Sequence, residues 1–174
     1  MTIEDVNSFG QERFVEKLGF LFEGSPWIAA QAWYSRPFAS LQDLHRALCD
    51  VMYGAVLEQK LSLIRAHPDL VGRAAISGTL TPESAREQTA AGLGQLSQDE
   101  IATFGRLNRE YKARFGFPFV ICARENKKES ILAGFASRMS NSPDEEIATA
   151  LHEISKIAYL RLVDVMDSKQ TQAK

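Results

Sequence analysis

The sequence RAHPDL at residues 65–70 marks the point where a helical pattern stops at a histidine. Leu57, Leu61 and Ile64 recur at spacings of three and four residues, which predicts a helix that ends here. Proline disfavours the α-helical conformation in the residue before it, so we expect His67 just beyond the helix end. A helix C-terminus favours the charged imidazole while burial opposes it, so this histidine could exchange a proton near neutral pH. Alternatively, His67 is only a surface residue or a hydrogen-bonded cap of the helix end.

Outward from this corner, every long periodic stretch of the chain predicts a helix. Several helices carry start signals, either a capping residue with an acidic or amide residue three positions later or a proline at the first helical position. The expected starts are Ser8, Ser25–Pro26, Ser40, Thr81–Pro82 or Ser84, Ser97, Asn126 and Ser142–Pro143. The pattern therefore predicts an all-α fold.

The stretch FGFPFVICAR, residues 115–124, is the exception to the helical pattern. Gly116 and Pro118 end a helix there, and the β-branched and aromatic residues that follow favour a buried extended chain. Such a segment has no obvious strand partner, so its backbone N–H and C=O groups need other partners. A flat ligand rich in amide groups would supply them, and so would ordered water or neighbouring helix ends.

Length and composition indicate one globular domain. The chain has 174 residues, of which 45% are hydrophobic, enough to bury a core. We predict one compact domain of about eight helices with one buried extended segment. It spans residues 1–174, with its core at about 9–165 and a flexible tail at about 168–174.

Charge and cysteine content narrow the partners and the compartment. The net charge is −2 and basic residues do not cluster among aromatic ones, so we expect no nucleic-acid partner. The apolar run at 117–123 is too short to span a bilayer and the N-terminus lacks a signal-peptide layout, so we expect no membrane association. Cys49 and Cys122 lie in apolar surroundings and form no metal-binding pair. They indicate reduced thiols in a cytoplasmic protein.

An arginine in the last predicted helix is aimed inward. At 100° per residue, Arg161 falls about 20° from Ile154 and about 40° from Val165, two residues of the apolar stripe. A buried guanidinium needs an anionic partner. That partner is either a core carboxylate such as Asp69 or the carboxylate of a ligand.

Several motifs in order carry a resemblance to a known family. They are HPDL (67–70), VGRAA (71–75), SAREQTAAGL (84–93), LNREYKARFGFPFVICAR (107–124) and EEIATALHEISKIAYLRL (145–162). Together they resemble the motifs of the 2-oxo-4-hydroxy-4-carboxy-5-ureidoimidazoline (OHCU) decarboxylases. These enzymes complete the conversion of urate to S-allantoin.

The resemblance implies an all-α, cofactor-free lyase, usually a homodimer, that converts a ureide substrate to S-allantoin and CO₂. It implies His67 as the catalytic acid/base. His67 could donate the proton or remove the hydroxyl proton, and we expect it to be the proton donor. We expect Glu87 to hold the substrate hydroxyl or to tune the imidazole, although Glu87 could equally be only the capping-box partner of Ser84. The substrate-binding residues implied are Pro68, Ser84, Ala85, Arg86, Glu87, Gln88, Phe119, Val120, Ile121, Cys122, Ala123 and Arg161.

Two other classes of function compete with this interpretation. A hydrolase acting on ureides is disfavoured, because the sequence offers no Ser/His/Asp or metal-ligand constellation. His45 and His152 fall on otherwise ordinary helices. A catalytically inert helical binding module is the other alternative, and replacement of His67 separates it from an enzyme.

Overall fold

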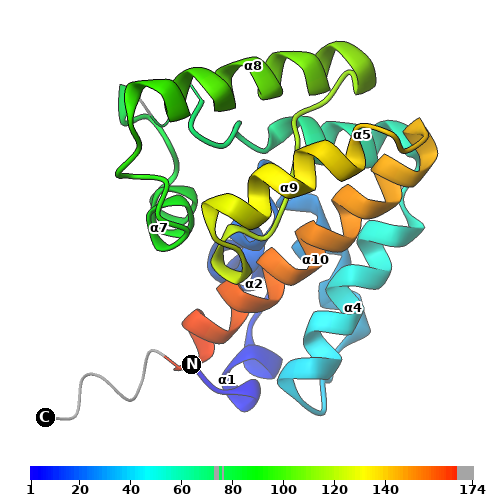
Figure 1. Cartoon of the computed structure of the whole chain (residues 1–174). Helices are drawn as coiled ribbons and strands as arrows, with labels where there is room; N and C mark the ends of the chain where they lie inside the picture. The colour runs from blue at the N-terminus through cyan, green and yellow to red at the C-terminus, as the bar shows by residue number, and fades with distance from the viewer. Residues whose placement is uncertain (73–74, 76, 168–174) are drawn as a thin grey trace, which may run out of the picture. The chain divides into compact units, whose positions relative to one another are not determined.

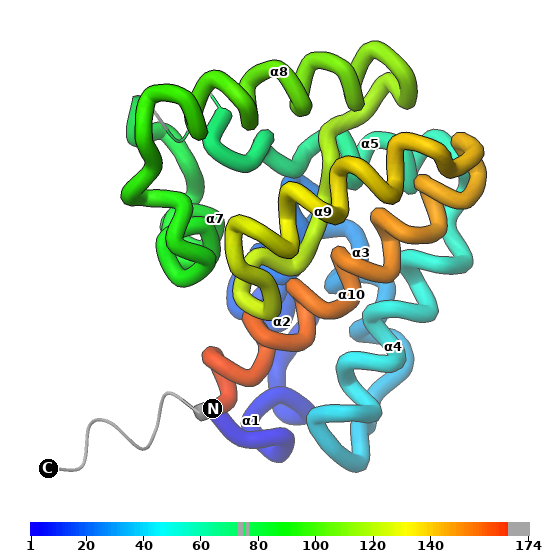
Figure 2. The backbone as a smooth tube through the Cα atoms, viewed as in Figure 1, coloured from blue at the N-terminus to red at the C-terminus, as the bar shows by residue number. Residues whose placement is uncertain are grey.

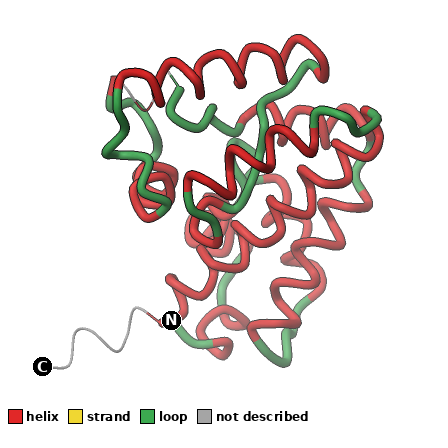
Figure 3. Tube along the Cα trace, viewed as in Figure 1, coloured by secondary structure: helices red, strands yellow, loops and turns green. Residues whose placement is uncertain are grey.

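The computed structural model describes residues 1–72, 75 and 77–167. Within these ranges the chain is helices and loops without a strand, which confirms the all-α prediction (Figures 1 and 3). The α-helices are α1 (Ile3–Ser8), α2 (Gln11–Leu18), α3 (Trp27–Ala32), α4 (Leu41–Gly54), α5 (Leu57–Ala66), α7 (Pro82–Ala90), α8 (Gln98–Phe115), α9 (Lys128–Arg138) and α10 (Pro143–Asp167). Three 3₁₀ turns are η1 (Gly19–Leu21), η2 (Trp33–Ser35) and η3 (Ala123–Glu125). The tail expected at 168–174 lies outside the described residues.

The chain divides into two compact units. The first contains Met1–Leu63 and the chain from Ser155 onward, and the second contains Ile64–Ile154. Helices α5 and α10 each contribute residues to both units. The expectation of a single domain stays a prediction.

The first unit is built on the packing of α3 against α2 and α4. Ser40 begins α4 as predicted, because its side chain accepts a hydrogen bond from the Asp43 N–H. Leu44, Leu48 and Met52 follow on one face of α4 and are fully buried. This spacing of four residues is the apolar stripe that the sequence predicts.

The second unit contains an aromatic core between α8 and α9. Tyr111 of α8 lies edge-on to Phe119 at 5.3 Å and to Phe135 of α9 at 6.2 Å. The rings of Phe119 and Phe135 stack at 3.9 Å. As Figure 2 shows, the chain leaves the end of α8 and returns through a loop to the start of α9. That loop carries the extended segment, and Phe119 anchors it in the core.

Helix α8 has the ends that the sequence predicts. Ser97 and Glu100 form a reciprocal capping box at its start. Gly116 follows its last residue with φ 77°, a left-handed conformation that glycine adopts without steric cost. The next residues, Phe117 to Val120, are buried and non-helical, which confirms the buried extended segment.

Three local expectations are wrong. Ser8 is the last residue of α1 and donates to the Asp5 carbonyl, whereas α2 begins after Gly10. Asn126 does not begin α9; its amide donates to the Cys122 carbonyl at 2.9 Å, and Lys127 takes the N-cap position. Leu57, expected on the buried face of α5, is 58% exposed. In the first two cases the side chain satisfies a different backbone group.

Candidate active site

Helix α5 ends at Ala66, directly before His67, as the histidine–proline pair predicts. The backbone N–H of His67 still donates to the Ile64 carbonyl at 3.2 Å. The side chain is only 8% exposed. His67 is therefore a buried imidazole on a fixed corner, which is the position predicted for it.

A strained turn follows the His67–Pro68 pair. Val71 adopts φ 52°, a conformation that is unfavourable for a β-branched residue. At the next position a Cβ atom would lie 2.5 Å from the Cβ of Asp69, so only glycine fits at Gly72. Strain of this kind persists only where surrounding contacts hold it, and it is common at active sites.

Helices α7 and α8 supply those contacts. Gln88 of α7 accepts from the Val71 N–H at 3.0 Å and donates to the Asp69 carbonyl at 3.3 Å. Asn108 of α8 donates to the Leu70 carbonyl at 2.8 Å. One turn further along α8, Lys112 pairs with the Asp69 carboxylate at 2.7 Å. The turn is thus held by three side chains from two helices.

Helix α7 presents one face of the expected binding stretch to the interior. Ser84 and Gln88 are buried one helical turn apart, and Ala85 and Glu87 are half-buried. Arg86 lies on the exposed face, where its guanidinium pairs with Glu83 at 3.4 Å. Of the binding residues expected on α7, Ser84 and Gln88 therefore face the interior and Arg86 faces solvent.

The start of α7 shows that Glu87 is not the capping-box partner of Ser84. Thr81 is the N-cap and accepts from the Ser84 N–H, with Pro82 at the first helical position. Ser84 is consequently the third residue of the helix, not its cap, and Glu87 lies in the body of α7. The capping-box alternative for Glu87 is wrong.

The extended segment obtains partners from two buried charged side chains. Arg138 of α9 donates to the Val120 carbonyl at 2.6 Å. Glu153 of α10 accepts from the Cys122 N–H at 2.8 Å. Side chains of neighbouring helices therefore satisfy these two backbone groups, which is neither the ligand nor the helix-end partner considered from the sequence. At the far end of the segment, α7 packs against η3.

Thus His67, the buried face of α7 and the extended segment all belong to the second unit. Helix α7 links them, because Gln88 bonds the turn after His67 and the helix packs against the end of the segment. The sequence did not indicate Asn108, Lys112, Arg138 or Glu153. Glu153 falls about 100° from Ile154 of the apolar stripe at 100° per residue, so the phase argument used for Arg161 does not find it.

Arg161 belongs to the first unit and is 3% exposed, as its phase predicts. Its guanidinium pairs with the Glu23 carboxylate at 2.9 Å and donates to the Phe20 carbonyl at 3.2 Å. The core carboxylate beside Arg161 is therefore Glu23. Asp69, suggested from the sequence, pairs with Lys112 instead.

Two other titratable groups are poorly suited to proton transfer at neutral pH. Burial raises the pKa of the Cys49 thiol to about 12. Its neighbour His45 cannot activate it, because the His45 Nε2 lies 2.9 Å from the Ser155 carbonyl and must donate there. Burial and the hydrogen bond to Glu146 raise the pKa of Tyr111. Both groups stay protonated.

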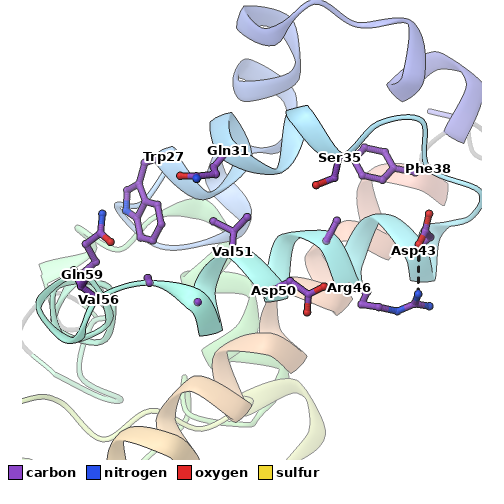
Figure 4. A pocket seen from close by; sticks show the side chains of 13 residues that line it. Trp27, Gln31, Ser35, Phe38, Asp43, Arg46, Asp50, Val51, Val56 and Gln59 are labelled. Carbon is purple, nitrogen blue, oxygen red and sulfur yellow. Dashed lines mark ion pairs between the residues drawn. The ribbon is translucent and has the colours of Figure 1, made fainter.

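Two surface cavities are lined by other residues. One, of about 600 Å³, lies between α3 and α4, with Trp27, Gln31 and Phe38 on one side and Asp50 and Val51 on the other (Figure 4). A second, of about 690 Å³, is bordered by Thr89 of α7, by Ala91, Gly92, Gly94 and Gln95 after it, and by the start of α9. Neither is lined by a residue of the predicted site.

Across the described ranges, no group of three or more His, Cys, Asp or Glu side chains is arranged to hold a metal ion. Nor is any helix in these ranges long and apolar enough to cross a membrane.

Comparison with known proteins gives a consistent result. The profile of the OHCU decarboxylase family matches residues 7–163. An OHCU decarboxylase of Amia calva is 44% identical, and one of Xenopus laevis 40%, each over all of this chain and 99% of the relative. The names of these relatives place the chain among the carboxy-lyases. It belongs to the OHCU decarboxylase family.

Solved structures agree with this assignment. A crystal structure of (S)-allantoin synthase superimposes with TM-score 0.74 at 27% identity, covering 96% of this chain and 54% of that chain. A crystal structure of OHCU decarboxylase in the presence of (S)-allantoin gives TM-score 0.68 at 25% identity, covering 90% and 99%. The all-α architecture is therefore that of solved relatives.

The Arg161–Glu23 pair predicts a loss of stability when either partner is changed. Arg161→Met leaves the Glu23 carboxylate buried without its cation, so we expect the free energy of unfolding to fall by about 3 kcal/mol. Glu23→Gln should also destabilise the fold, by leaving the guanidinium without its anion. Urea unfolding of both variants measures this, with Arg46→Met, which removes an exposed 3.5 Å pair with Asp43, as the control. Unchanged midpoints for both buried variants would contradict a stabilising role for the pair.

Proposed function

We propose that this chain catalyses the decarboxylation of OHCU to S-allantoin and CO₂, the last step in the conversion of urate to allantoin. One observation carries the proposal: the match to the decarboxylase family spans the chain and includes the buried corner at His67. The proposed site consists of His67 and Pro68, the buried side of α7, and the backbone of Phe119–Ala123.

The chemistry of the substrate explains why side chains of this kind suffice. The carbon that loses CO₂ also carries a hydroxyl and adjoins an imine carbon. The electron pair released with CO₂ flows to the nitrogen of the C=N bond, which takes up a proton, and this gives an enol-like intermediate. Protonation of the neighbouring carbon on one face then yields a single enantiomer, and loss of the hydroxyl proton gives the carbonyl. Because the substrate contains its own electron sink, we propose that no cofactor or metal takes part.

In this proposal His67 is the proton donor and Glu87 is its partner. The held turn that follows Pro68 fixes the backbone on one side of His67, and the end of α5 fixes it on the other. A proton donor held in one place delivers its proton to one face of a planar intermediate. Glu87 is half-buried in the body of α7. We propose that it holds the substrate hydroxyl or tunes the imidazole.

Substrate binding is proposed for Pro68, Ser84 to Gln88, Phe119 to Ala123, and Arg161. The buried positions of Ser84 and of the extended segment support this assignment. For Gln88 we propose a second task, since its amide already bonds the turn beside His67. Arg161 is held by Glu23, and a planar guanidinium fixed in this way suits a two-pronged contact with a carboxylate or ureido oxygen.

The test of the reaction uses the unstable substrate made in situ. Urate is converted to OHCU by the two preceding enzymes, and circular dichroism follows S-allantoin with and without this protein. We expect the protein to accelerate formation of the S enantiomer, at a rate that exhaustive chelation leaves unchanged. An accumulation rate equal to the spontaneous one would contradict the function. Loss of activity on chelation with recovery on adding a divalent ion would contradict the metal-free chemistry.

Replacement of His67 separates an enzyme from a binding module. We expect His67→Asn to slow product formation by at least about a hundredfold, the low end of what a positioned proton donor contributes. The thermal transition should stay nearly unchanged, because asparagine retains polar hydrogen bonding at the corner. His152→Asn, an exposed histidine on α10, is the matched control and should keep the wild-type rate. Near-wild-type turnover by His67→Asn would move the catalytic centre elsewhere, with Glu87 the next candidate.

We further propose a homodimer in the cytoplasm. Cys49 and Cys122 are buried and form no disulfide, as suits a reducing compartment. Tyr53, Val56 and Leu57 expose 44%, 65% and 58% of their surface around the α4–α5 junction, an apolar patch of the kind that marks interfaces. Light scattering of the wild type should give twice the mass of one chain, and Leu57→Glu should lower the measured mass to that of one chain. Tyr34→Glu, which changes another exposed aromatic residue, should leave the measured mass at that of the dimer. A wild-type protein with the mass of one chain would refute the dimer.

A further inference from the structure

The extended segment has the alternation of a β-strand although it pairs with no strand in the described part of the chain. A Cβ atom placed on Gly134 of α9 would lie 3.3 Å from Cζ of Phe119 and 3.6 Å from Cδ1 of Ile121. Side chains two residues apart therefore face the same part of α9, as in an extended chain. In such a chain the backbone N–H and C=O of alternate residues point to opposite edges. Val120 and Cys122 share one edge, and Ile121 faces the other.

The edge formed by Val120 and Cys122 is occupied by two opposite charges. Arg138 donates to the Val120 carbonyl at 2.6 Å, and Glu153 accepts from the Cys122 N–H at 2.8 Å. Arg138 is 8% exposed and Glu153 is 9% exposed. Hydrogen bonds to charged groups are shorter and stronger than neutral ones, so this edge is tightly held.

Each charge matches the backbone group that it bonds. A carbonyl oxygen can only accept, and guanidinium offers only donors; an amide N–H can only donate, and a carboxylate only accepts. Arg138 is itself held in place, because its Nε and Nη2 atoms bond Glu146 at 3.0 and 2.9 Å. Its guanidinium carbon also lies 4.3 Å from the centre of the Phe119 ring. These contacts fix the orientation of the segment as well as its position.

We propose that Arg138 and Glu153 are positioning residues for substrate binding. They hold the Val120–Cys122 edge so that the N–H and C=O of Ile121 face the bound substrate. An adjacent donor and acceptor suit a cyclic ureide, whose ring also presents an N–H beside a C=O. The inference rests on the proposed function, since it assumes that the segment binds this substrate.

Two substitutions at Glu153 separate positioning from charge. The glutamine of Glu153→Gln keeps an oxygen that can accept from the Cys122 N–H, whereas a leucine of similar size has no acceptor. We therefore expect Glu153→Leu to raise KM about tenfold with a smaller change in kcat, and Glu153→Gln to stay within about threefold of wild type. A Glu153→Leu variant with unaltered KM would overturn the proposal. So would equal damage in both variants.

A stability control excludes a general effect of weakened folding. Val6→Ala removes fully buried atoms in α1, remote in sequence from the segment, and should lower the melting temperature without moving KM. If Val6→Ala raised KM as much as Glu153→Leu at a similar melting temperature, the positioning role would be refuted. Arg138→Lys, which cannot bond Glu146 and Val120 together, should likewise raise KM.

A measurement on the wild-type protein does not depend on any variant folding. By NMR, the Cys122 amide should exchange slowly in the free protein, because Glu153 holds it. The Ile121 amide should respond to added S-allantoin, the proposed product, with a larger shift change than the Cys122 amide. The reverse pattern would overturn the edge assignment. If the wild type fails to form allantoin, the proposed function itself fails; if it forms allantoin but Glu153→Leu behaves as wild type, only this inference fails.

Discussion

The buried ion pair between Arg138 and Glu146 is the interaction on which the second unit depends. Glu146 is fully buried, and its carboxylate receives hydrogen bonds from Arg138, from the Tyr111 hydroxyl and from Asn141. A buried carboxylate is costly unless its oxygens are satisfied, so these partners must stay in place together. They come from α8, from α9 and from the loop that follows α9. The cluster fixes where α8, α9 and the first turns of α10 meet.

The extended segment is placed by the same cluster. Its backbone cannot bond to itself as a helix does, and it is buried, so partners must come from elsewhere. Arg138 serves both needs, because one side of its guanidinium neutralises Glu146 and another atom bonds the Val120 carbonyl. In the same unit, the strained turn after His67 is held in a comparable way by Gln88, Asn108 and Lys112. In both places rigid helices hold irregular backbone, as a precise site requires.

The helices could be predicted because their signals are local. Ser40, Ser97 and the His67–Pro68 pair act through neighbours within four residues, so the sequence alone indicates where α4 and α8 begin and where α5 ends. Asn126 carries a start signal of the same kind but bonds the Cys122 carbonyl instead. The hydrogen bond to the Cys122 carbonyl therefore outweighs the preference of asparagine for the N-cap position. Leu57 shows a further limit, since periodicity marks an apolar face without saying what covers it.

The two inward arginines show where sequence reasoning stops. The phase of a helix predicts that Arg161 is buried, because phase depends only on residues of that helix. It cannot name the partner, since Glu23 lies 138 positions away in the chain. Arg138 and Glu146 are only eight positions apart, yet they lie on different helices, and no single period relates them. Partner choice is a property of the packed fold. The burial of Arg161 therefore follows from the sequence, whereas its partner and the roles of Arg138 and Glu153 follow only from contacts in the fold.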